Sequence, residues 1–173
     1  MFVLGIDPGL SRCGYAVLEA QGRAGRQHRA VALGVIRTHK DDPLPSRLAE
    51  LQGELRALIA EHRPQAVAVE QVFFQVNVRT AMSVGQASGL AMAEAAAAGC
   101  EVAQYTPNQV KESVAGWGAA GKEQVQTMVQ TLLGLAEVPR PADAADAAAL
   151  ALTHLAIGPT RAAVSAAVAR SGS

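Results

Sequence analysis

The amino-acid sequence predicts an α/β protein with a mixed five-stranded sheet and helices on both faces. Three strand-like segments, at residues 2–6, 13–19 and 30–37, follow one another through short connections, which indicates antiparallel neighbours. From about residue 45 onward, helical segments alternate with two short strands, a pattern typical of crossovers between parallel strands. The two patterns together predict one sheet that contains both kinds of pairing.

The first strand has the clearest end. Residues 2–6 are an uninterrupted apolar run, which stops at Asp7-Pro8-Gly9. Because Pro8 cannot donate to a strand ladder and Gly9 permits unusual backbone angles, we expect a turn directly after Asp7. A glycine-containing loop then separates the second and third strands.

The second part of the chain alternates helices and strands. Leucine and isoleucine recur at helical spacing between residues 48 and 59, and Pro64 follows, which predicts an amphipathic helix ending near residue 62. Thr106 before Pro107 is typical of a helix start. The other expected elements are strands at 66–70 and 102–105 and helices at 78–98, 107–115, 122–133 and 142–157.

Length and composition indicate one domain with a core of small aliphatic residues. The chain has 173 residues, of which 50% are hydrophobic and 3% aromatic, and its formal net charge is zero, so a nucleic-acid partner must be argued from local sites. We expect a domain over 1–158 and a poorly ordered tail over 159–173. No membrane span and no signal peptide are recognisable, which favours a cytoplasmic protein.

Four acidic residues occupy unusual positions. Asp7 and Glu70 each end an apolar strand, whereas Asp143 and Asp146 lie three residues apart at the start of the last helix. In a sheet of this order the first and fourth strands can be parallel neighbours, whose carboxyl ends share one edge. Residues three apart share one helix face, so all four carboxylates converge if the last helix begins at that edge.

Converging carboxylates repel one another unless cations compensate them. Hard oxygen ligands suit Mg²⁺, with Mn²⁺ as an alternative, and two such ions can activate a water and stabilise a leaving phosphodiester oxygen. A structural alternative exists for Asp143 and Asp146, because acids are common in the first turn of a helix. Asp7 and Glu70 have no comparable structural role, and we expect them to be functional.

Several motifs in this order resemble the RuvC family of Holliday-junction resolvases between about residues 3 and 157. GIDPG-like strand ends also occur in phosphate-binding ATPases, so the complete set carries the resemblance. It comprises Gly5-Ile6-Asp7-Pro8-Gly9, Ile36-Arg37-Thr38, Leu44-Pro45-Ser46-Arg47-Leu48, Glu70-Gln71-Val72-Phe73, Gly85-Gln86-Ala87, Gln109-Val110-Lys111, Lys122-Glu123-Gln124-Val125-Gln126, Asp143-Ala144-Ala145-Asp146-Ala147 and Thr153-His154.

The resemblance implies a ribonuclease-H-like fold and a crossover junction endodeoxyribonuclease. Such an enzyme makes paired, symmetric, metal-dependent nicks in two strands of like polarity during recombination and DNA repair. The positions that match the family's metal-binding and catalytic carboxylates are Asp7, Glu70, Asp143 and Asp146. The implied partners are a four-way DNA junction, a second copy of the chain and the branch-migration proteins RuvA and RuvB.

Basic and aromatic residues complete the expected site. Lys111 and Lys122 match family positions near the DNA phosphates, and Lys122 is also expected to be catalytic by offsetting transition-state charge. Phe73 matches an aromatic that stacks on a base at the junction, and Arg79 is a candidate phosphate contact. His154 is expected to be a satisfied helix residue outside the site.

Small residues in the 78–98 helix predict a two-fold dimer. They allow two helices to approach closely, although alanine is also simply a good helix former. One metal site makes one nick, so a symmetric pair of sites suits a symmetric junction.

Three other functions stay open from the residues alone. An actin-like or sugar-kinase ATPase would need a second lobe and a second glycine-rich phosphate loop, and neither is recognisable here. A related ribonuclease-H-like nuclease could act on RNA or flush duplex instead. A non-catalytic junction-binding scaffold would not need four acids.

Overall fold

The computed structural model describes residues 1–21, 27–71 and 78–171, without the side chains of 78–80 and 159–171. The strands are β1 (Phe2–Asp7), β2 (Arg12–Gln21), β3 (Gln27–Arg37), β4 (Ala66–Glu70) and β5 (Glu101–Tyr105). The helices are α1 (Leu44–His62), α2 (Val78–Ala97), α3 (Pro107–Ala115), α4 (Lys122–Leu133) and α5 (Ala142–Ser171).

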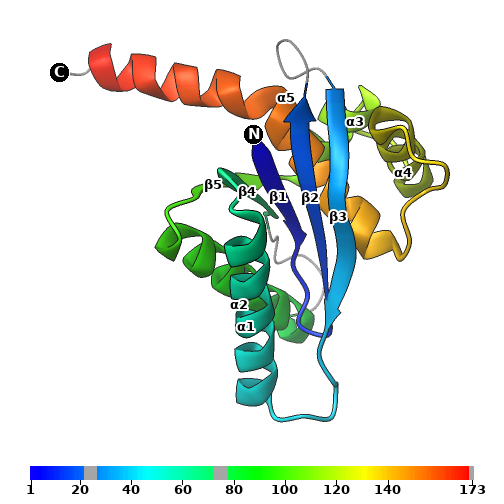
Figure 1. The fold of residues 1–173 in the computed structure, drawn as a ribbon, viewed down its shortest axis with the longest axis vertical. Helices are drawn as coiled ribbons and strands as arrows, with labels where there is room; N and C mark the ends of the chain where they lie inside the picture. The colour runs from blue at the N-terminus through cyan, green and yellow to red at the C-terminus, as the bar shows by residue number, and fades with distance from the viewer. Residues whose placement is uncertain (22–26, 72–77, 172–173) are drawn as a thin grey trace.

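The five strands form one mixed sheet in the order β3-β2-β1-β4-β5, as Figure 1 shows. The first three strands are antiparallel neighbours, whereas β4 is parallel to both β1 and β5. The predicted fold class is therefore confirmed, and so is the expected parallel contact between the first and fourth strands. The strand β3 begins at Gln27, three residues before its predicted start.

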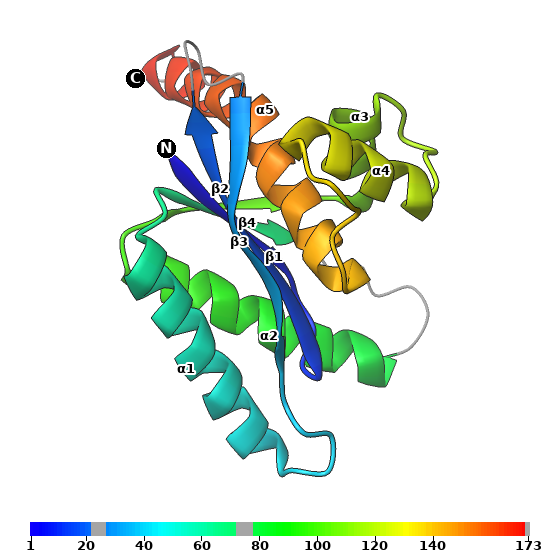
Figure 2. The same cartoon turned by 45° about the vertical axis from the view of Figure 1, so that its right-hand side comes forward.

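Helices cover both faces of the sheet, and Figure 2 shows the two layers from the side. On one face α1 and α2 pack through Leu51, Leu55 and Ile59 and the small residues Ala87, Ala91 and Ala95. On the other face α3, α4 and α5 pack against the remaining half of the strand residues. Strand alternation supplies both layers, because successive side chains point to opposite faces.

The core has the small aliphatic composition that the sequence predicts. Valine, leucine, isoleucine and alanine fill both layers, and among the described residues Tyr105 is the single phenylalanine, tyrosine or tryptophan that is fully buried. Cys13 is buried and Cys100 is half-buried, and neither is in a disulfide. Within the described ranges, no helix combines the length and apolarity that crossing a membrane requires.

The last helix is longer than the sequence predicts. It continues to Ser171, whereas the sequence predicted a helix over 142–157, and its final part extends beyond the sheet (Figure 1). The alanine-rich segment after Pro159 has a high helix propensity, which favours continuation. The division into a domain of 1–158 and a poorly ordered tail stays a prediction.

Candidate active site

Strand alternation places Asp7 and Glu70 on the face of the sheet that α5 covers. In β1, Val3 belongs to the core layer under α5, and Asp7 lies four residues later, on the same face of the strand. In β4, Ala66 and Ala68 belong to the same layer, which puts Glu70 on the same side. Because Ile6 pairs with Val69 in a parallel register, the two carboxylates end neighbouring strands at one edge.

Two glycines let α5 approach this edge closely. A Cβ on Gly5 would lie 2.0 Å from the backbone oxygen of Ala147, and one on Gly14 would lie 2.1 Å from that of Asp143. No side chain fits in either place, so the helix backbone lies directly on β1 and β2. Since Gly14 is the register partner of Asp7, this packing brings the start of α5 beside the Asp7 carboxylate.

The two acids of α5 each contact a cation. Arg12, the first residue of β2, donates from Nε to Asp143 Oδ2 at 3.1 Å, and its terminal nitrogen contacts the same oxygen. Lys122 Nζ donates to Asp146 Oδ2 at 2.7 Å. The sequence analysis did not single out Arg12, because a lone arginine after a turn carries no local signal of its function.

Burial and mutual repulsion raise the pKa of the strand-end acids. Desolvation, followed by repulsion from Glu70, Asp146 and Asp143, raises the pKa of Asp7 from 3.8 to about 7, and Lys122 opposes this rise. Desolvation and the charge of Asp146 also raise the pKa of Glu70. The hydrogen bond to Asp146 is the main cause that raises the pKa of Lys122. At Asp7, burial and repulsion by the three other carboxylates therefore outweigh the opposing charge of Lys122.

Within the described part of the chain, no three acidic, histidine or cysteine side chains are arranged to hold one ion as they stand. Arg12 and Lys122 each contact one carboxylate oxygen of the two helix acids. The donor set itself fits a hard divalent cation, because it consists of carboxylates that lie close enough to repel one another. The residues therefore fit the expected metal once the helix acids exchange partners.

The predicted lysines lie next to the acids. A hollow of about 250 Å³ is lined by Lys111, Lys122, Glu70 and Asp146, with an apolar floor from α3, α4 and α5. Lys122 is the first residue of α4, as expected. Lys111 lies in the middle of α3, and that helix begins with the predicted cap at Thr106, whose side chain accepts from the Gln109 N–H.

The loop after Asp7 is held by two residues from the predicted motifs. The hydroxyl of Thr38 donates to the carbonyl of Leu10 at 2.6 Å, and Arg47 Nε donates to Thr38 Oγ1 at 2.9 Å. Arg47 also donates to Ser11 Oγ at 2.5 Å. These bonds join α1 and the end of β3 to the turn that follows the first catalytic candidate.

The comparison with known proteins gives the family. The family model for crossover junction endodeoxyribonuclease RuvC matches residues 3–154, which is most of the chain. The chain belongs to the RuvC family. The RuvC of Salinispora arenicola is 55% identical over 170 residues, covering 98% of this chain and 96% of that protein. The RuvC of Syntrophomonas wolfei is 50% identical over 155 residues, covering 90% and 88%.

Solved structures agree with the RuvC assignment. The structure of Thermus thermophilus RuvC matches with a TM-score of 0.86 and 39% identity, covering 92% of this chain and 96% of that one. The same RuvC in complex with a Holliday junction substrate matches with a TM-score of 0.85. The yeast mitochondrial Holliday junction resolvase Ydc2, at 16% identity and a TM-score of 0.64, shares the ribonuclease-H-like fold.

Three residues considered from the sequence are not among the described side chains of the carboxylate cluster. Phe73 lies outside the described residues, as does its neighbour Phe74. Arg79 falls in the first turn of α2, and its side chain is outside the description. His154 is buried and its Nδ1 lies 2.9 Å from the Tyr105 hydroxyl, which confirms that it is a satisfied helix histidine.

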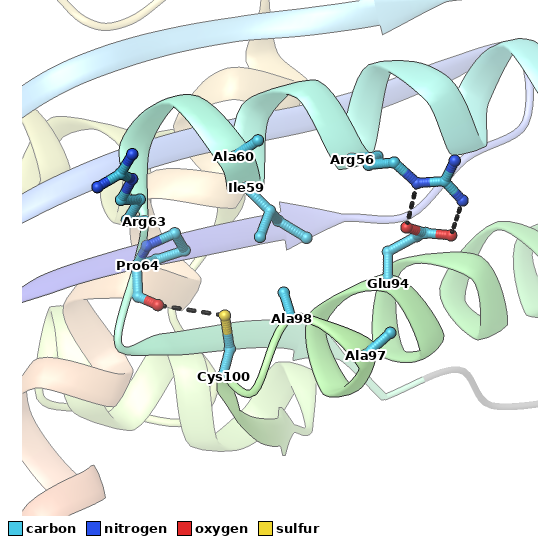
Figure 3. A pocket seen from close by; sticks show the side chains of 9 residues that line it. All are labelled: Arg56, Ile59, Ala60, Arg63, Pro64, Glu94, Ala97, Ala98 and Cys100. Carbon is cyan, nitrogen blue, oxygen red and sulfur yellow. Dashed lines mark hydrogen bonds and ion pairs between the residues drawn. The ribbon is translucent and has the colours of Figure 1, made fainter.

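A larger hollow, of about 680 Å³, is shown in Figure 3, and none of the four carboxylates lines it. It lies between the C-terminal parts of α1 and α2, where the Arg56 guanidinium donates two hydrogen bonds to Glu94. The Cys100 thiol there donates to the Pro64 carbonyl. This hollow is at the opposite end of the parallel strands, where β4 and β5 begin, so it does not take part in the chemistry of the four acids.

The raised pKa of Asp7 predicts a pH-dependent stability of the metal-free protein. A carboxyl whose folded pKa lies above its unfolded value favours folding at low pH, and this contribution is lost between about pH 4 and pH 7. Asp7→Asn should therefore be more stable than the wild type by about 2–4 kcal/mol at pH 8 and equal to it near pH 4. Thermal unfolding in chelator across this pH range measures the difference.

Asp42→Asn is the matched control for the predicted pH dependence of stability, because Asp42 is exposed in the loop before α1. Its stability should follow that of the wild type at every pH. A difference between Asp7→Asn and wild type that does not change with pH would contradict the electrostatic account. Divalent cations should reduce the stability difference between the wild type and Asp7→Asn at pH 8, since their binding stabilises the folded wild type.

Proposed function

We propose that this chain resolves four-way DNA junctions by nicking two strands of like polarity in a metal-dependent reaction. The observation that carries the proposal is the convergence of four carboxylates and two lysines at one sheet edge. A phosphodiester is the substrate class that such a set suits, because cations neutralise its charge while carboxylates hold hard metal ions. A Holliday junction is the substrate named for the Thermus thermophilus RuvC complex.

Asp7, Glu70, Asp143 and Asp146 are the proposed ligands of two Mg²⁺ ions, for which Mn²⁺ can substitute. Bound ions of this kind activate a water and stabilise the leaving oxygen. Asp7 and Glu70 would bind the ions from the side of the sheet, because each is the last residue of a β-strand. Asp143 and Asp146 would bind the ions from the side of α5. For this, Arg12 and Lys122 must release the carboxylate oxygens that they now contact.

Two lysines and two residues that follow β4 in the sequence are proposed to hold the DNA. Lys122, whose ammonium lies at the carboxylate cluster, offsets the negative charge that develops during cleavage. Lys111 binds a backbone phosphate from the other wall of the same hollow. Phe73 is proposed to stack on a base at the junction centre and Arg79 to contact a phosphate, both on the sequence pattern alone.

The proposed active form is a homodimer joined along α2. Ala87, Ala91 and Ala95 pack inward, so part of the small-residue pattern serves the monomer core. Met82, Gly89 and Ala93 form an exposed stripe on the outer side of the helix, and Met82 is 59% exposed. Two such stripes can approach closely, and a two-fold pair then presents two cutting sites to a two-fold substrate.

Gly89→Lys tests the dimer without disturbing the monomer, because a Cβ at Gly89 meets no atom within 4 Å. We expect monomers in sedimentation and single nicks in place of paired ones, since a buried lysine pair repels across the axis. Gly53→Lys is the matched control, because Gly53 is also exposed, helical and open around its Cβ, but on α1. A wild-type chain that is monomeric at assay concentration and still cuts in pairs would contradict the dimer.

A substrate comparison tests the function itself. The protein is incubated with labelled four-way junction, linear duplex and RNA–DNA hybrid, with Mg²⁺ and with chelator. We expect paired cuts in the junction alone and only with the metal. Cutting confined to the hybrid would favour another ribonuclease-H-like nuclease, and junction binding without cutting would favour a scaffold. RuvA and RuvB are the proposed partners, and the cytoplasm is the proposed compartment.

A further inference from the structure

Two arginines face each other across β2 and β3 at the edge that carries the active site. Arg12 and Arg37 are register partners, at the start of β2 and the end of β3. Side chains of directly paired residues point to the same face of a sheet. That face is the one under α5, because Arg12 reaches Asp143 there and Leu33 of β3 packs against the same core layer.

The charges of this pair are only half compensated. Arg12 is joined to Asp143, whereas among the described residues no carboxylate forms an ion pair with Arg37, which is exposed. Two like charges opposite each other destabilise a strand pair. The same two strands avoid this at their other end, where Arg29 lies opposite Glu19 and contacts its carboxylate at 2.9 Å. The Arg12–Arg37 pair therefore has one guanidinium more than the protein's own acids satisfy.

The position of Arg37 suits a DNA backbone that crosses the carboxylates. In the sheet, β3 is two strands from β1, so Arg37 lies about 10 Å from the strand of Asp7. Lys111 lies on the other side, on α3, which follows the outer strand β5. A DNA strand held over the four carboxylates would thus meet a positive charge on each side. A guanidinium is suited to this role, since it can bind a phosphate through two parallel hydrogen bonds.

We propose that Arg37, beside Arg12, binds a backbone phosphate of the DNA strand being cut, on the side of the carboxylates opposite Lys111. The inference rests on the proposed function and adds a second phosphate site to it. Arg12 contributes a neighbouring positive charge. Arg37 is a binding residue in this account and takes no part in the bond-breaking step.

Arg37→Gln should weaken junction binding in a salt-dependent way. Losing one phosphate contact lowers the slope of log affinity against log salt by about 0.9. Between 50 and 200 mM salt, the wild type should therefore lose about 3.5-fold more affinity than the variant. Binding is measured by fluorescence anisotropy in chelator, so that no strand is cut. Arg37→Lys should keep the wild-type slope, because it keeps the charge.

Methylphosphonate substitution identifies the phosphate. Single uncharged linkages are placed in turn on each side of the cutting position of the wild-type enzyme. We expect one position at which neutralisation weakens binding by the wild type and has no further effect on Arg37→Gln. Additive losses at every position would overturn the proposal, as would an unchanged salt slope in Arg37→Gln.

Arg29→Gln is the matched control, because Arg29 lies eight residues earlier on β3 and already has Glu19 as its partner. Its salt slope should equal that of the wild type. A wild-type protein that cuts junctions while Arg37→Gln binds them like wild type would overturn this inference alone. A wild-type protein that neither binds nor cuts junctions would overturn the proposed function as well.

Discussion

Asp7→Asn is expected to lower the single-turnover rate of junction cleavage by about 1000-fold or more while junction binding is retained. Asp7 is close enough to Glu70 and to both acids of α5 for all three to raise its pKa, so we expect its charge to be needed to hold divalent cations in the cluster. Asparagine keeps the shape and one oxygen but removes that charge. Affinity should be equal or slightly higher, because a negative group near the phosphates is gone.

Glu70→Gln should behave in the same way, because Glu70 ends the neighbouring parallel strand and is the largest source of charge repulsion on Asp7. Rates are measured with enzyme in excess over labelled junction, and dissociation constants are measured in chelator. Asp42→Asn should match the wild type in both. Near-normal cleavage by either strand-end variant would remove these acids from the catalytic centre.

Gly5→Ala is expected to destabilise the protein by about 1–3 kcal/mol and to impair cleavage of the protein that remains folded. The added methyl group would lie 2.0 Å from the Ala147 backbone oxygen and 2.9 Å from the Ala151 backbone nitrogen, so α5 must move away from β1. Asp143 and Asp146 are on that helix and would move with it. Both helix acids would then lie farther from Asp7 and Glu70.

Gly53→Ala is the control for this packing effect. Gly53 is in α1, and no atom lies within 4 Å of an added Cβ there. Alanine at such a helical position should stabilise the protein by about 0.5–1 kcal/mol. Thermal unfolding measures both variants, and single-turnover cleavage well below the unfolding temperature separates geometry from stability. A Gly5→Ala protein with unchanged stability and rate would show that this close approach does not position the acids.

Local patterns in the sequence were sufficient for the elements and for the four acids. The apolar run of residues 2–6 determined β1 and left Asp7 at its end, and the same logic applied to Glu70 after β4. Thr106 and Pro107 determined the start of α3 because capping depends on residues three apart. These features follow from neighbouring residues, which is why they can be read without coordinates.

Element ends were less accessible to such reasoning. The last helix was expected to end near residue 157, whereas the alanine-rich continuation extends it to Ser171. The register irregularity between Val17 and Leu18 likewise has no local signal in the sequence. Both depend on a balance between weak local preferences, which single residues do not decide.

The tertiary structure alone decided how the acids are compensated. Arg12 meets Asp143 across 131 positions of sequence, and this contact requires Gly14 to admit the start of α5. That Arg37 lies opposite Arg12 likewise depends on the strand register. Sequence spacing determines which residues share a face of one element. The charges and backbones that meet between elements depend on strand order, register and the absence of two side chains at Gly5 and Gly14, so they appear only in the folded chain.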